Sequence, residues 1–95
     1  MSNKSLKDEI ESTLGPARWS ELGREIAKDS IIIVSSKLDL VDMAMLVARD
    51  DADQIKELIK NGSLVKPSEE IVKDWGEEDP ELTCVIVKPF ILVQK

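Results

Sequence analysis

The stretch Leu40–Ala48 is the feature that most constrains the fold of this chain. Eight of its nine residues are apolar or alanine, so a helix over this range would present hydrophobic surface all round. Helices of this kind lie inside a domain, and a bilayer span needs about 20 apolar residues. The pattern therefore predicts a central core helix that the rest of the chain encloses on every side.

The length and composition are typical of one small globular domain. The 95 residues are 42% hydrophobic and 34% charged, which argues against disorder. We expect a single domain over residues 6–94, preceded by a flexible N-terminus at 1–5. The net charge of −6 is spread along the chain, without the concentrated Lys and Arg that phosphates require. We therefore expect no nucleic-acid partner and no membrane partner.

Cysteine usage and the polar start of the chain bear on its compartment. Met1 to Lys4 is not followed by an apolar run, so no signal peptide is visible. The single cysteine, Cys84, lies in an apolar strand pattern and is expected to be buried and unreactive. These features predict a cytoplasmic protein.

Periodicity and capping signals outline the other elements. Ile31–Val34 is a short β-branched run that predicts a strand covered on both faces, at the centre of a sheet. A brief strand is expected over 63–66. Further helices are expected over 6–14, closed by Gly15 and Pro16, over 18–28, from an Asp51 cap to Asn61-Gly62, and over 69–75 from a Ser68 cap, before an acidic loop at 76–81.

The C-terminal run over 82–93 is apolar apart from Thr83 and the interruption at Lys88-Pro89, and it has two interpretations. It forms either one long strand kinked at Pro89, which must then lie at an edge or bulge, or two shorter strands that reverse there. We favour the kinked strand. An exposed apolar strand is a plausible contact surface, so the sequence predicts a surface for a protein partner or a second copy. Its residues would be Trp19, Val87, Phe90, Ile91, Leu92 and Val93.

Two carboxylates, Asp39 and Asp42, stand at the start of the predicted core helix. Asp39 is placed to cap the first turn, and both charges face the positive end of the helix dipole. We favour this structural role. The functional alternative is a ligand or acid–base cluster in which Arg18 or Lys37 lies beside the pair.

The sequence lacks most of the motifs that mark catalytic, metal or phosphate sites. The chain has no histidine, which excludes Ser-His-Asp and Cys-His arrangements and zinc sites of the Cys/His kind. The four glycines are too far apart for a phosphate loop, and the aspartates from Asp51 onward lack the glycine and glutamate of a calcium loop. The sequence predicts no catalytic residue, no metal and no cofactor.

Several segments, in order and spacing, resemble the small bacterial family DUF2288, whose function is unknown. The resemblance covers about residues 6–94 and implies a single bacterial domain, but it transfers no site. The segments that carry it are 15–22, 31–34, 38–42, Asp50-Asp51, 62–64, Lys66-Pro67, Trp75 and 87–94.

Together these observations predict an α+β (mixed α/β) domain with four to five helices packed on a small sheet of about three strands. The function they favour is a non-catalytic protein-interaction or regulatory module that self-associates through the C-terminal strand. The alternative is a small-ligand binder or enzyme that uses Asp39 and Asp42.

Overall fold

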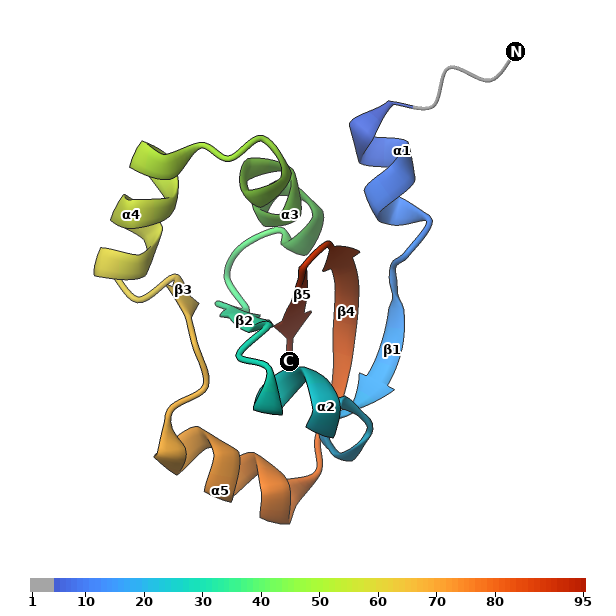
Figure 1. The fold of residues 1–95 in the computed structure, drawn as a ribbon, viewed down its shortest axis with the longest axis vertical. Helices are drawn as coiled ribbons and strands as arrows, with labels where there is room; N and C mark the ends of the chain where they lie inside the picture. Colours follow the sequence, from blue (N-terminus) through green and yellow to red (C-terminus); the bar gives the residue numbers. More distant parts are fainter. Residues whose placement is uncertain (1–4) are drawn as a thin grey trace.

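The computed structural model describes residues 5–95, in which helices pack on a single sheet in an α+β fold (Figure 1). Residues 1–4, and with them most of the expected flexible N-terminus, lie outside the described residues. The elements follow one another as α1 (Leu6–Glu11), β1 (Gly15–Arg18), the 3₁₀ helix η1 (Trp19–Leu22), α2 (Gly23–Ala27), β2 (Ile31–Val34), α3 (Leu40–Ala48), α4 (Ala52–Lys60), β3 (Leu64–Val65), α5 (Glu69–Glu78), β4 (Glu81–Val87) and β5 (Phe90–Gln94).

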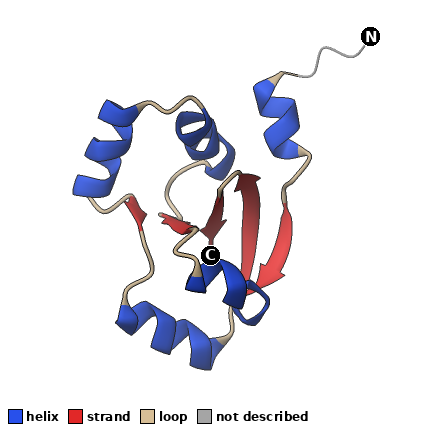
Figure 2. Cartoon of the chain, in the orientation of Figure 1, coloured by secondary structure: helices blue, strands red, loops and turns tan. Residues whose placement is uncertain are grey.

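The strands form one mixed sheet in the order β1-β4-β5-β2-β3. The neighbours β2 and β5 run parallel, and the other three pairs run antiparallel. Helices cover both faces, and in Figure 2 α3 and α4 lie on the opposite side of the strands from α2 and α5. The domain therefore has three layers with the sheet in the middle.

The strand predicted at Ile31–Val34 is confirmed, and its covered faces explain its composition. Side chains alternate along β2, so Ile31 and Ile33 pack beneath η1, α2 and α5, while Ile32 and Val34 pack beneath the other helices. β2 has a strand on each side, although the middle position of the sheet belongs to β5. A run without polar residues is what such a doubly covered strand requires.

The expectation of about three strands was too low, partly because Gly15–Arg18 forms β1. Gly15 and Pro16 were expected to close a helix that reached Leu14, but α1 ends at Glu11 and the chain then extends along β4. Pro16 has no N–H to offer, which suits the edge position of β1. The helix expected over 18–28 is instead η1 followed by the short α2.

The kinked strand favoured for residues 82–93 was wrong, and the alternative of two strands is correct. β4 and β5 form a hairpin in which Val87 pairs with Phe90 across Lys88 and a cis Pro89. Both strands lie inside the sheet, β4 beside β1 and β5 beside β2. The apolar run is long because each of its two strands is packed on both faces.

The helix predicted at Leu40–Ala48 exists, but it is not enclosed on every side. Leu40 and Ala44 are 5% and 0% exposed, whereas the other apolar side chains of α3 are partly exposed. The helix lies on one face of the sheet, against β4 and β5, with α1 beside it and α4 after it. A helix in an outer layer has a side facing away from the sheet, and these neighbours cover that side incompletely.

Three of the predicted helix starts are confirmed by their caps. The side chains of Asp39, Asp51 and Ser68 accept hydrogen bonds from the backbone N–H groups of Asp42, Gln54 and Ile71, at 3.0, 3.4 and 3.2 Å respectively. The turn after α4 uses Gly62 at φ +82°, as expected for a helix C-terminus. α5 continues to Glu78, so part of the expected acidic loop is helical.

Trp19 and Trp75 lie together on the face of the sheet that η1, α2 and α5 cover. The rings of Trp19 and Trp75 meet edge to face, with centroids 5.1 Å apart and planes at 85°. Trp19 is buried with Leu22, Leu82 and Val93. This contact joins η1 to α5, through two residues that are 56 positions apart in the sequence.

We predict that Leu92→Ala lowers the free energy of unfolding by about 2–5 kcal/mol, because Leu92 is fully buried in β5. Ile86→Ala on the neighbouring strand is the matched control. Ile86 is 44% exposed, so its truncation should cost about 1 kcal/mol or less. Urea denaturation of both variants measures the difference, and equal losses would contradict this account of the core.

Candidate functional site

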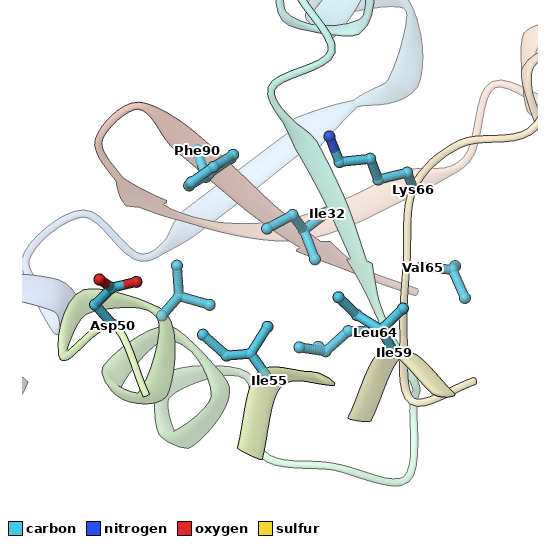
Figure 3. Close-up of a pocket in the computed structure, with 9 residues that line it drawn as sticks. Ile32, Asp50, Ile55, Ile59, Leu64, Val65, Lys66 and Phe90 are labelled. Carbon is cyan, nitrogen blue, oxygen red and sulfur yellow. The ribbon is translucent and has the colours of Figure 1, made fainter. Parts of the chain in front are cut away.

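A pocket of about 440 Å³ opens on the sheet face that carries α3 and α4 (Figure 3). Its walls come from β2, the end of α3, α4, β3 and the start of β5. Seven of its nine lining residues are apolar: Ile32, Val47, Ile55, Ile59, Leu64, Val65 and Phe90; the other two are Asp50 and Lys66.

The pocket exists because α4 covers its end of the sheet incompletely. α4 is amphipathic, and Leu58 packs on the core while Ile55 stays half-buried. Ile59 is 57% exposed, the highest value among the exposed large hydrophobic residues. The sheet below is narrow, since β3 has only two residues. The apolar side of α4 is therefore left partly open.

The two charged lining residues stand at opposite ends of the apolar side chains (Figure 3). Asp50 lies in the turn from α3 to α4 with φ +55°, and its carboxylate has no hydrogen-bond or ion-pair partner within residues 5–95. The Lys66 ammonium lies 2.8 Å from the Asp29 carboxylate. The site thus combines an apolar floor with one free negative charge and one paired positive charge.

The lining offers mainly apolar surface to whatever enters the pocket. A partner gains free energy here by burying apolar surface, at roughly 25 cal/mol per Å². Asp50 and Lys66 can orient what binds.

The cluster considered at the sequence level, Arg18, Lys37, Asp39 and Asp42, is not brought together. Arg18 is on the edge strand β1, 4.0 Å from Asp79, and two strands separate β1 from β2, after which the three other residues follow. Asp39 caps α3, Asp42 is exposed in its first turn, and the N–H of Lys37 donates to the Ser35 hydroxyl. None of the four lines this pocket.

The surface proposed around the C-terminal strand is also changed by the structure. Trp19, Leu92 and Val93 are buried, so they offer nothing to a partner in this conformation. Val87, Phe90 and Ile91 are partly buried. Phe90 alone of the six lines the pocket, and β5 is hydrogen-bonded on both sides rather than at an edge.

Sequence reasoning missed the pocket residues on α4. The spacing of Ile55, Leu58 and Ile59 did indicate an amphipathic helix, as the structure confirms. The spacing alone could not reveal that Ile59 lies outside the core, because that depends on how α4 sits on the sheet. The available signal was limited to the three large apolar positions of α4 over its two and a half turns.

Cys84 faces the core below β4, away from the pocket, and is a free, buried cysteine. Burial raises the pKa of the Cys84 thiol, and the negative charge of Glu21 raises the pKa further. The thiol is therefore held in its unreactive, protonated form.

We predict that Cys84 in the native protein reacts with a thiol reagent far more slowly than in urea. The pKa of the Cys84 thiol is higher in the folded protein than in the unfolded chain, so the thiol of the unfolded chain ionises first as the pH rises. The free energy of unfolding should therefore fall as the pH rises from about 8 towards 10.

The Cys84→Ala variant has no thiol to titrate, so its free energy of unfolding should fall less over the same pH range. Equal pH dependence of the two proteins would contradict burial of the thiol.

We predict that Asp39→Ala lowers the free energy of unfolding by about 1 kcal/mol, because it removes the cap of α3. Asp39→Asn keeps an acceptor at the cap and should restore most of the loss. Asp42→Ala removes only a favourable charge near the helix N-terminus and should lower the free energy of unfolding by about 0.3–1 kcal/mol. Thermal denaturation of the three variants checks this order, and an Asp42 loss larger than the Asp39 loss would contradict it.

No helix within residues 5–95 is both long enough and apolar enough to cross a membrane. The same residues hold no group of three or more Cys, Asp or Glu side chains arranged for a metal ion.

Comparison with solved structures finds the same fold in PA1075 from Pseudomonas aeruginosa, determined in solution by NMR. The two proteins are 29% identical, with a TM-score of 0.81, over 99% of this chain and 89% of the other. Comparison with curated proteins finds no match. Residues 5–95 match the family described as "Protein of unknown function (DUF2288)". The chain therefore belongs to the DUF2288 family.

Proposed function

We propose that this protein is a non-catalytic protein-interaction module whose docking site is the pocket beside α4. The observation that carries the proposal is the apolar pocket of about 440 Å³ with the exposed Ile59 at its rim. Contiguous apolar surface of this kind is characteristic of contact sites, because water solvates it poorly. The free thiol of Cys84 is compatible with a reducing cytoplasm, the compartment we propose.

The sheet edges favour side-chain docking over strand addition. Both edge strands are short, β1 with Pro16 inside it and β3 with Pro67 soon after it. Proline and short edges discourage backbone pairing with another chain. A partner that inserts apolar side chains into a groove needs no free edge.

A second candidate is binding of a small apolar molecule. The pocket volume falls within the range of about 300–1,000 Å³ that is usual for such sites, and a few polar groups at the rim are also usual. Asp50 and Lys66, rather than Asp39 and Asp42, would then orient the ligand. Solvent extraction of the protein purified from its own cells, followed by mass spectrometry, would detect it.

We predict that a photo-crosslinking amino acid at position 59 captures a partner protein in the source cells. The same amino acid at position 72 is the matched control, since Val72 is 39% exposed but lies on α5. The captured protein, once identified, should bind the purified module, and Ile59→Asp should weaken that binding at least about tenfold, as expected for the loss of a central apolar contact.

Adducts from position 59 that are no more abundant than those from position 72 would overturn the interaction proposal. Binding that persists unchanged in Ile59→Asp would place the contact on another surface. A small molecule in the extract with no protein adduct would favour the second candidate.

A further inference from the structure

The turn that joins α4 to β3 contains the dipeptide Asn61-Gly62. Asn61 ends α4, and Gly62 follows it at φ +82°. Both residues are exposed, and apart from the chain neighbours of Gly62 no heavy atom lies within 4 Å of the place that a Cβ would occupy there. Solvent therefore reaches this peptide unit from the side on which other residues carry a side chain.

An asparagine that precedes glycine is open to attack by the next backbone nitrogen, because glycine has no side chain to hinder the approach. The Gly62 nitrogen gives its proton to a solvent base and bonds to Cγ of Asn61. The Cγ–Nδ2 bond breaks, and Nδ2 takes a proton from water and leaves as ammonia. Water then opens the five-membered ring, giving aspartate if the bond from nitrogen to Cγ is cleaved and isoaspartate if the bond from nitrogen to the backbone carbon is cleaved.

The closed turn holds the two reacting groups apart. The ψ angle of Asn61 is 3°, which points the Gly62 nitrogen away from the Asn61 side chain. The Gly62 N–H donates to the Ile59 carbonyl at 3.2 Å, and the Ser63 N–H donates to Oδ1 of Asn61 at 2.9 Å. Rotation about ψ of Asn61 has to release the Gly62 hydrogen bond before the nitrogen reaches Cγ. The reaction therefore requires the turn to open.

This part of the fold is fastened by few buried apolar side chains. Ile59 is 57% exposed, Ile55 is half-buried, and residues 60–62 are exposed. Segments of this kind open locally at a lower free energy than global unfolding requires. We propose that Asn61 deamidates in the folded protein, through local opening of the turn between α4 and β3.

The products of this reaction alter a wall of the pocket. Ile59 and Leu64, which stand on either side of the turn, both line it. Aspartate at position 61 places a negative charge at the C-terminus of α4, where the helix dipole disfavours it. Isoaspartate lengthens the backbone between Ile59 and Leu64 by one methylene group. The chemical step is independent of the proposed function, and only its effect on docking rests on that function.

Incubation at mildly alkaline pH, followed by peptide mass spectrometry, tests the site. The peptide that contains residue 61 should gain about 1 Da in the folded wild-type protein, since an amide becomes an acid. Protein isoaspartate methyltransferase should label the same peptide. The chain unfolded in guanidinium should react faster, because its turn is always open. In Asn61→Gln, the control, the longer side chain does not form the five-membered ring, so the peptide should keep its mass.

A folded wild-type protein that gains no mass while the unfolded chain reacts completely would overturn the inference. A gain of equal size in Asn61→Gln would place the reaction at another residue and would also overturn it.

Two helix caps test whether the opening is local. Asp51→Ala removes the cap of α4, and Ser68→Ala removes the matching cap of α5. In the folded protein Asp51→Ala should speed deamidation by about fivefold, as expected for the loss of an N-cap, whereas Ser68→Ala should leave the rate nearly unchanged. An amide NMR spectrum of each variant checks that it is folded. Equal acceleration by the two variants would mean that only global unfolding exposes Asn61, and would overturn local opening.

The outcomes also separate this inference from the interaction proposal. A mass gain at residue 61 with no adduct from position 59 supports deamidation and overturns the docking site. A specific adduct from position 59 without the mass gain supports the docking site alone.

Discussion

The parallel pairing of β2 with β5 is the contact on which the rest of the structure depends. It joins Ile31, Ile32 and Ile33 to Ile91, Leu92 and Val93, residues separated by about two thirds of the chain. Ile31, Leu92 and Val93 are completely buried, so the ladder is also the centre of both apolar layers. The remaining strands extend the sheet from this pair, and helices from both halves of the chain cover it.

The two faces of the sheet are covered unequally, and this difference produces the candidate site. On one face Trp19 and Trp75 fill the space between the sheet and its helices. On the other, α4 rests beside a strand of only two residues, and its Ile55 is only half-buried. Apolar side chains that would enter a larger core therefore line an open pocket, and Ile59 remains in contact with water.

Local signals predicted the elements whose cause is local. Asp39, Asp51 and Ser68 cap helices because each side chain bonds to an N–H three residues away, a relation visible in the sequence. Ile31–Val34 was recognisable because an unbroken β-branched run suits a strand covered on both faces. The site was predicted less well: Phe90 was named as a contact residue, but Ile55, Ile59, Asp50 and Lys66 were not.

By itself the sequence determined the α+β class, the capped helix starts, the strand Ile31–Val34 and the apolar character of the C-terminal run, because these follow from residue type and short-range spacing. Only the tertiary structure decided that Gly15–Arg18 joins the sheet, that the run reverses at Lys88-Pro89, and that Ile59 stays exposed. Each of these depends on contacts between residues far apart in the chain, which no local pattern encodes. The pocket has the same origin, since its walls come from five segments that only the folded sheet brings together.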